Sequence, residues 1–264
     1  MDPYTQMLFH DAAFQDALKL KIYKFSAQDL SEAEQSFYSK HVAVSEAQAV
    51  TMLAETRSQE NTKWHRERKV RITGSKCHEY FTFVPKENRS WEEKISAMMA
   101  DTFRGNDATR YGKESEPEAT ATYENLMANE VTQVGFCVHP LLPWLGYSPD
   151  GVIFKEGKPA ILLEIKSPVS GQEKKAAELA ADKKLRYIKK DGENLVLNQK
   201  HKYFSQVQLG MFLLNLNLTH FVVYSKVEPL ILTIPRCDNH IDMLVRKLQA
   251  VYFKHFLPKL AASV

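Results

Sequence analysis

The chain has 264 residues, of which 44% are hydrophobic and 25% charged, so it is long enough to bury a sizeable core. Its net charge of +3 does not by itself indicate a nucleic-acid partner. No stretch approaches the roughly 18 apolar residues of a membrane span, and no signal-peptide pattern opens the chain, which predicts a soluble intracellular protein, cytoplasmic or nuclear.

The N-terminal half of the chain is predicted to be helical. Residues 26–58 have loosely spaced apolar residues and a capping box formed by Ser31 and Glu34. Ser75 is either the N-cap of a short helix over 76–81 or a ligand-binding residue. Amphipathic helices are expected over residues 91–103 and 111–127.

Charge is distributed unevenly along this part of the chain. Residues 1–60 carry nine Asp or Glu against five Lys or Arg, whereas residues 61–76 carry six Lys or Arg against one Glu. A second basic stretch, residues 172–202, carries nine Lys or Arg against five acids. Two such stretches are typical of a surface that follows a phosphate backbone, although each alone would also suit a solvated helix face.

The middle of the chain predicts strands that carry ionisable residues. Residues 131–138 alternate like one strand, and residues 148–154 and 161–166 form a hairpin. Asp150 stands at the head of the first apolar run, while Glu164 and Lys166 lie two apart in the second and therefore share a face. Burying a carboxylate and an ammonium together is costly, and a metal ion held by Asp150 and Glu164 would compensate.

The rest of the chain completes the predicted sheet. Residues 170–200 are polar and lysine-rich without a dense core pattern, which predicts either a flap beside a substrate or a surface insertion. A helix is expected over 201–215, strands over 219–225 and 230–234, and a helix capped by Asp238 that ends near residue 256.

Five motifs in the right order resemble one nuclease family. Asp150 with Glu164-Ile165-Lys166 is the D…ExK signature of the PD-(D/E)XK nuclease superfamily. The local spellings S-P-D-G and L-E-I-K-S-P resemble its lambda exonuclease and YqaJ-like viral recombinase branch. Three further matches to that branch are Trp64-x-x-x-Arg68 with Thr73-Gly74-Ser75, Gly112-x-x-x-Glu116, and Gln206-x-Gln208.

The resemblance implies a restriction-endonuclease-like α/β fold, in which helices flank a central mixed sheet. Residues 61–264 would form this nuclease domain, and residues 1–60 an N-terminal helical accessory region. It also implies a Mg²⁺-dependent deoxyribonuclease that accepts Mn²⁺ and holds two ions. Asp150, Glu164 and the Ile165 carbonyl would bind the first ion, and Lys166 would orient or deprotonate the nucleophile. Glu116 would serve the second ion or its water, with Glu114 and Glu118 as competing candidates.

The same resemblance implies a 5′ to 3′ exonuclease that acts on double-stranded DNA. Its 5′-phosphate pocket would consist of Arg68, Ser75, Ser148 and Gln206, since guanidinium and hydroxyl groups bind phosphate well. The implied partners are linear duplex DNA ends, further copies of the chain in a ring-shaped trimer, and a single-strand annealing protein, in recombination or repair. Two alternatives stay open: an endonuclease or single-strand nuclease with the same metals, and a catalytically idle DNA-binding recombination module.

Overall fold

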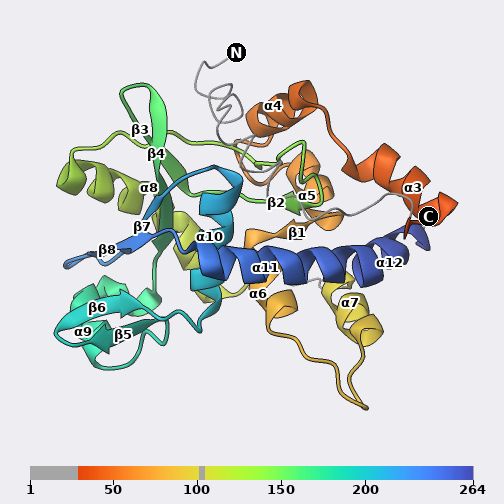
Figure 1. Ribbon diagram of the computed structural model, residues 1–264. Helices are drawn as coiled ribbons and strands as arrows, with labels where there is room; N and C mark the ends of the chain where they lie inside the picture. The colour runs from red at the N-terminus through yellow and green to blue at the C-terminus, as the bar shows by residue number, and fades with distance from the viewer. Residues whose placement is uncertain (1–28, 101–104, 264) are drawn as a thin grey trace.

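The computed structural model describes residues 29–100 and 105–263. Within these residues a four-stranded sheet lies at the centre of the fold, and helices cover it (Figure 1). Its strands are, in spatial order, β3 (Gly151–Lys155), β4 (Lys158–Lys166), β7 (Leu218–Val223) and β8 (Leu230–Pro235). β4 and β7 run parallel, whereas the outer pairs are antiparallel. The predicted mixed sheet is therefore confirmed.

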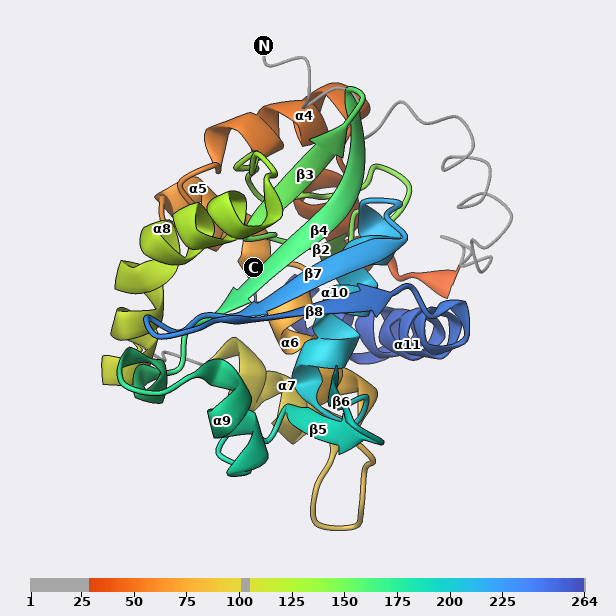
Figure 2. The same cartoon turned by 90° about the vertical axis from the view of Figure 1, so that its left-hand side faces the viewer.

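Different helices cover the two faces of the sheet (Figure 2). α8 (Asp107–Met127) packs on one face, where Ala119 and Tyr123 contact the core around Leu163 and Ile165. α10 (Lys202–Leu213) lies on the other face and packs against α6 (Gly74–Phe81) and α11 (Asp238–Val251). This arrangement is the predicted α/β sandwich, with β4 in its middle.

The hairpin of β3 and β4 forms as its sequence predicts. Glu156 and Gly157 occupy the turn with φ angles of 52° and 73°, the left-handed pair that a tight two-residue hairpin turn requires. Because β4 is flanked by β3 and β7, Glu164 projects from the centre of the sheet, opposite Phe221 of β7.

The strand predicted over residues 131–138 needs correction. Residues 131–138 pair only through isolated bridges, because their backbone contacts the N-terminal region instead. The Phe136 N–H donates to Thr56 Oγ1 at 2.7 Å, and a Cβ atom at Gly135 would lie 2.1 Å from the Leu53 carbonyl oxygen. The loop that follows contributes a short strand, β2 (Leu145–Gly146), which pairs in parallel with β1 (Ile72–Thr73).

The lysine-rich segment after β4 has a core of its own, contrary to the prediction. It contains a 3₁₀ helix (Val169–Gln172), α9 (Ala176–Ala181), β5 (Ile188–Asp191) and β6 (Asn194–Leu197). Leu179, Leu185 and Ile188 form a cluster with Phe204 and Phe221 of the main fold. These apolar residues are scattered among lysines without a regular spacing, so the sequence pattern did not indicate a core.

The N-terminal region consists of several short helices where one pattern was expected. They are α3 (Glu32–Phe37) with a π-helical turn (Tyr38–Val42), α4 (Glu46–Glu55) and α5 (Thr62–Lys69). The capping box of Ser31 and Glu34 is confirmed, and Ser45 forms a second one with Gln48. Residues 1–28 of the predicted accessory region lie outside the described residues.

The remaining helices follow the predictions with shifted ends. α7 (Trp91–Met99) ends before residues 101–104, which lie outside the described residues. α8 begins four residues earlier than predicted, at Asp107, with Asn106 as its N-cap. Asp238 is the first residue of α11, whose N-cap is Cys237, and the helical chain continues through a π-helical turn (Tyr252–Phe256) into α12 (Leu257–Ala261). Among the described helices, none has the length and apolar character needed to cross a membrane.

Candidate active site

The predicted acids and lysine meet where β3 and β4 lie side by side. Lys166 Nζ donates to Glu164 Oε1 at 2.5 Å and to the Ile165 carbonyl at 3.0 Å. Asp150 Oδ2 lies 4.0 Å from Lys166 Nζ and accepts a hydrogen bond from the Ile165 N–H at 2.6 Å. The side chain of Glu164 is only 1% exposed, while those of Asp150 and Lys166 are each 21% exposed. Lys166 is therefore the common ion-pair partner of two carboxylates, one of them buried and the other partly exposed.

The electrostatics of this cluster favour a further cation. Burial first, and then the charge of Glu164, raise the pKa of Asp150 to about 8. Burial alone would lower the pKa of Lys166, but the charges of Glu164 and Asp150 outweigh it and raise that pKa above its ordinary value. Lys166 is thus held as a cation, and Asp150 retains a proton near neutral pH that a metal ion would displace.

Glu116 reaches toward this cluster from α8. Its pKa is raised, by burial first; the charge of Lys166 opposes this and that of Glu164 adds to it. The competing candidates are exposed on the same helix, where Glu118 lies 3.7 Å from Lys226 and Glu114 lies 4.0 Å from Arg110. The geometry thus favours Glu116 as the acid of α8 that faces the site.

The donor set fits a hard divalent cation. Across residues 29–100 and 105–263, no three His, Cys, Asp or Glu side chains lie close enough together to hold a metal ion. The set that the structure does bring together is two carboxylates, from Asp150 and Glu164, with the Ile165 carbonyl beside them. Mg²⁺ and Mn²⁺ prefer such oxygen ligands and complete their shells with water and substrate oxygens.

The two candidate glutamines have different roles. Gln206 Nε2 donates to Glu164 Oε1 at 2.5 Å, so its amide joins the acid cluster. Gln208 is buried, donates to the Pro235 carbonyl at 3.0 Å and accepts from the Cys237 N–H at 2.8 Å. Gln208 therefore connects α10 to the end of β8, and Gln206 is the glutamine that reaches the site.

The predicted phosphate-binding residues also come together. Arg68 donates from Nη2 to Ser75 Oγ at 3.1 Å and from Nη1 to Ser148 Oγ at 3.4 Å. Trp64 Nε1 donates to the same Ser148 oxygen at 2.9 Å, and the Arg68 guanidinium lies 4.1 Å from the centre of the indole ring. Burial lowers the pKa of Arg68 to about 10, which leaves it cationic at neutral pH. The Arg68 guanidinium is thus in contact with the hydroxyls of Ser75 and Ser148, and Ser148 is two positions before Asp150 in the sequence.

The alternative prediction, that Ser75 is the N-cap of a helix, is wrong. The N-cap of α6 is Thr73, and Ser75 is an exposed residue in the first turn, where it faces Arg68 instead of capping the helix.

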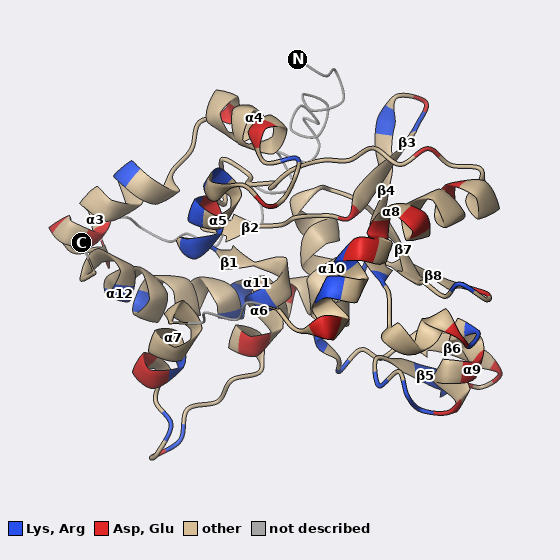
Figure 3. Ribbon diagram, turned by 180° about the vertical axis from the view of Figure 1, so that it is seen from behind, with Lys and Arg blue, Asp and Glu red and all other residues tan. Residues whose placement is uncertain are grey.

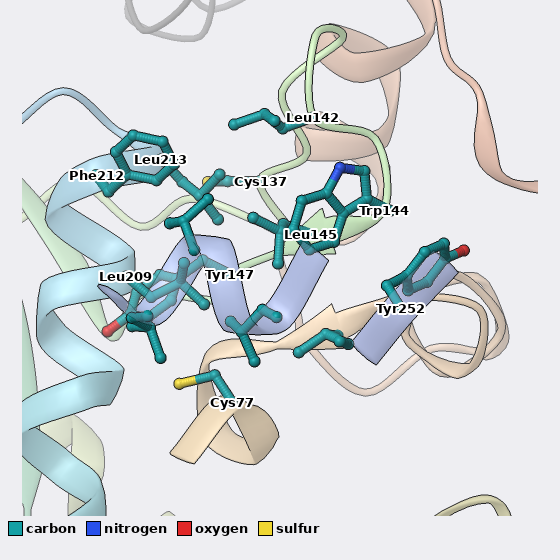
Figure 4. Close-up of a cluster of buried hydrophobic side chains, with 14 of the residues drawn as sticks. Cys77, Cys137, Leu142, Trp144, Leu145, Tyr147, Leu209, Phe212, Leu213 and Tyr252 are labelled. Carbon is teal, nitrogen blue, oxygen red and sulfur yellow. The ribbon is translucent and has the colours of Figure 1, made fainter. Parts of the chain in front are cut away.

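The sequence analysis missed Tyr147, which contacts the acid cluster of Asp150, Glu164 and Lys166 through Glu164. Its buried Oη donates to Glu164 Oε2 at 2.6 Å. The ring lies between two helices, because a Cβ atom at Gly74 would come within 2.4 Å of it and one at Gly210 within 2.6 Å. Figure 4 shows Tyr147 beside Leu209 of α10 in this core. The available signal was Gly210, a glycine within a helix, between the apolar residues Leu209 and Met211.

Gln59 was also missed, and it comes from the N-terminal region. Its Nε2 donates to the Val134 carbonyl at 3.1 Å and to the Pro149 carbonyl at 2.8 Å, directly before Asp150. Its φ of 53° is unusual for a glutamine and has no local sequence signal. The N-terminal region therefore supports the strand that carries Asp150.

A groove of about 920 Å³ opens beside the acid cluster. It lies between the segment that leads into α5 and the exposed side of α8, and its lining includes Arg57, Gln59, Trp64, Lys113 and Glu116. Glu116 and Trp64, which both line it, connect the groove to the acids and to the Arg68 site.

Solved structures of nucleases have the same fold. An alkaline exonuclease from Laribacter hongkongensis superposes with a TM-score of 0.57 at 22% identity, over 77% of this chain and 95% of that chain. The SOX protein of Kaposi's sarcoma-associated herpesvirus, in an RNA complex, gives a TM-score of 0.54 at 11% identity, over 92% and 86%. A SOX–DNA complex gives 0.50 at 13% identity, over 88% and 83%. These identities establish a shared fold and no more, and no curated protein sequence matches the chain.

The sequence itself carries the family assignment. The profile of the YqaJ-like viral recombinase domain matches residues 63–216, which is more than half of the 264 residues. The matched part includes Arg68 in α5, Glu116 in α8, the β3–β4 hairpin and Gln206 in α10. The chain therefore belongs to the family of YqaJ-like viral recombinase domains, within the PD-(D/E)XK-like exonuclease fold.

Proposed function

We propose that this protein is a Mg²⁺-dependent deoxyribonuclease that degrades duplex DNA from 5′-phosphorylated ends in the 5′ to 3′ direction. The observation that carries the proposal is that Asp150, directly before β3, meets Glu164 and Lys166 of β4. The Arg68 cluster, which we define as Arg68, Ser75 and Ser148, includes a residue only two positions before Asp150 in the sequence. In this proposal the acids and Lys166 form the hydrolytic site, and Arg68 with Ser75 and Ser148 forms the site for the DNA end beside it. The residues for the ions are Asp150, Glu164, the Ile165 carbonyl and Glu116.

Each part of the acid cluster has a role that follows from its contacts. When bound, Mg²⁺ supplies Lewis-acid stabilisation of the phosphate and a lowered pKa for its water, and Mn²⁺ does the same. Lys166, held by Glu164 and the Ile165 carbonyl, presents its ammonium as a donor that orients the attacking water. Its raised pKa favours this orienting role over removal of a proton. Gln206 and Tyr147 fix the Glu164 carboxylate, each at a different oxygen.

The Arg68 cluster suits the terminal phosphate of the strand being degraded. A guanidinium grips phosphate through paired charge-assisted hydrogen bonds, and the hydroxyls of Ser75 and Ser148 add two more donors. Trp64 keeps the guanidinium in place by stacking and by holding Ser148. Hydrolysis that leaves a new 5′-phosphate would return the same kind of end to this cluster.

The structural neighbours support this proposal by what they bind. The Laribacter exonuclease has also been solved in complex with dAMP, and the SOX structures contain RNA or DNA. A ring-shaped trimer and a single-strand annealing partner belong to the proposal as well. Light scattering tests the trimer, which would have three times the 30.3 kDa mass of one chain.

The experiment that tests the end-dependent activity compares three DNAs in Mg²⁺ and in EDTA. They are a 5′-phosphorylated linear duplex, the same duplex with 5′-hydroxyl ends, and a closed duplex circle. The proposal predicts rapid, metal-dependent loss of the phosphorylated duplex alone. Arg68→Ala should abolish the preference for phosphorylated over hydroxyl ends, while Arg66→Ala, an exposed change on the same helix, should keep it. Equal cleavage of the circle would contradict the assignment of Arg68 to ends.

A further inference from the structure

A second groove is lined in part by Arg68 and does not include Ser148. It has a volume of about 410 Å³ and runs between α5, the first turns of α6, and the helices α7 and α12. Its lining consists of two kinds of wall, one basic and one apolar. The basic wall comprises His65, Arg68, Lys69 and Lys76, with the buried Arg71, paired with Glu67, behind them. The apolar wall comprises Tyr80, Met98, Met99, Phe256 and Leu260, and Thr73 completes the lining.

The charge of this groove suits a phosphate chain. Among the described residues that line it, none is acidic, whereas the groove beside Glu116 also contains Glu60 and Glu124. Figure 3 shows the basic residues gathered along α5. Arg68, Lys69 and Lys76 make this side of the groove positively charged, and such a surface concentrates anionic ligands.

The apolar wall suits a nucleobase. Methionine side chains adapt their shape to a flat partner, and Met98 and Met99 provide the accessible apolar surface here, because Tyr80 and Phe256 are each only 4% exposed and support them from the core. Met99 is 37% exposed, so its side chain is accessible at the surface of the groove. A volume of about 410 Å³ falls in the range of small-ligand pockets, roughly 300–1,000 Å³, and a nucleotide unit presents both a phosphate and an apolar base.

Arg68 connects this groove to the proposed phosphate site. Its guanidinium hydrogen-bonds Ser75 and Ser148, and its side chain also forms part of the groove wall. A site restricted to terminal phosphates would need a wall behind that phosphate. The groove that Arg68 lines is instead basic on one side and apolar on the other.

We propose that a strand can continue in the 5′ direction past Arg68 into this groove, so that the protein also cuts strands with an unpaired 5′ extension. The inference rests on the proposed nuclease function and specifies its substrates. Water adds to the scissile phosphorus and the bond to the 3′ oxygen breaks, and that oxygen leaves as a hydroxyl after taking up a proton. The extension departs as an oligonucleotide with a 3′-hydroxyl, and the duplex keeps a 5′-phosphate.

The test measures the size of the product released from a labelled extension. One duplex carries an unpaired 5′ extension with a fluorophore at its 5′ end, and a second has a flush, 5′-phosphorylated end. The inference predicts that the fluorophore leaves on a short oligonucleotide in Mg²⁺. Lys69→Glu should lower the rate on the extended duplex, relative to the flush one, on the order of tenfold, because it replaces a phosphate-binding cation with an anion. Arg66→Glu makes the same charge change on the same helix, outside this groove, and should leave the ratio unchanged.

The outcomes separate this inference from the proposed function. If the flush duplex is degraded but the fluorophore stays on the strand or leaves only as a mononucleotide, the groove does not accept a strand and the inference is wrong. The same conclusion follows if the oligonucleotide appears but Lys69→Glu and Arg66→Glu affect both duplexes alike. If neither duplex is cut in Mg²⁺ or Mn²⁺, the proposed function fails and the inference fails with it.

Discussion

Tyr147 offers a sharp test of how the acid cluster is held together. Replacing it with Phe removes only the oxygen that donates to Glu164 Oε2, and the ring still fills the space between Gly74 and Gly210. Glu164 is 1% exposed, so this carboxylate oxygen loses a donor in a place that water does not easily reach. Hydrogen bonds to charged groups contribute about 1.5–3 kcal/mol, and we expect Tyr147→Phe to lower the free energy of unfolding by that amount in EDTA.

The same substitution should weaken metal binding. With one oxygen released, the Glu164 carboxylate can rotate away from the geometry that Gln206 and Lys166 support. Loss of a residue that orients a ligand typically costs about 10–100-fold in metal affinity. Calorimetric titration with Mn²⁺ measures the affinity, and urea unfolding followed by circular dichroism measures the stability.

Tyr123→Phe is the matched control. Tyr123 is equally buried, but its Oη is bonded to His220 Nδ1 at 2.6 Å and to no carboxylate. We expect it to cost about 0.5–1.5 kcal/mol in stability and to leave Mn²⁺ affinity unchanged. This role of the Tyr147 hydroxyl would be refuted if Tyr147→Phe matched the wild-type protein in both measurements. It would also be refuted if Tyr123→Phe weakened Mn²⁺ binding as much as Tyr147→Phe does.

Three further predictions concern packing, pH and the glutamine pair. Gly210→Ala should destabilise the protein by about 1–3 kcal/mol, because its Cβ would lie 2.6 Å from a buried ring, whereas Gly112→Ala, with open space around it in α8, should stabilise it by about 0.5–1 kcal/mol; thermal unfolding distinguishes them. In EDTA the folded protein keeps a proton on Asp150 up to about pH 8, whereas an unfolded Asp loses it near pH 4, so stability should fall as pH rises between these values. Asp150→Asn should remove that part of the fall in urea titrations, and an unchanged pH profile would contradict the assignment. Gln206→Ala should reduce DNA cleavage and should lower stability less than Tyr147→Phe does, because Lys166 still donates to the same Glu164 oxygen. Gln208→Ala should cost about 1–3 kcal/mol, because the buried Gln208 amide holds both the Pro235 carbonyl and the Cys237 N–H and each would lose its partner.

The parts of the site predicted from sequence are those that depend on short-range pattern. Glu164 and Lys166 meet because residues two apart on a strand share a face, and Asp150 joins them because a tight turn returns the chain beside them. The position of Ser75 next to Arg68 followed from a family motif and not from any local rule.

The parts that could not be predicted depend on contacts between distant segments. Residues 131–138 alternate as a strand should, but Thr56 takes a backbone hydrogen bond that a neighbouring strand would otherwise make. Tyr147 belongs to an apolar run, and nothing in that run shows that its hydroxyl reaches Glu164. The core of residues 169–200 is completed by Phe204 and Phe221, which come later in the chain.

In the proposed mechanism, Lys166 and the two acids beside it hydrolyse DNA with a divalent cation. The most direct measurement is the single-turnover cleavage rate of a 5′-phosphorylated duplex in Mg²⁺ and in EDTA, for the wild-type protein, Lys166→Ala and Lys158→Ala. Lys158 is exposed at the start of the same strand, β4, and is the matched control. We predict cleavage by the wild-type protein and Lys158→Ala in Mg²⁺ alone, and a loss of at least about a hundredfold in Lys166→Ala. Full metal-dependent cleavage by Lys166→Ala, or cleavage that persists in EDTA, would contradict the account.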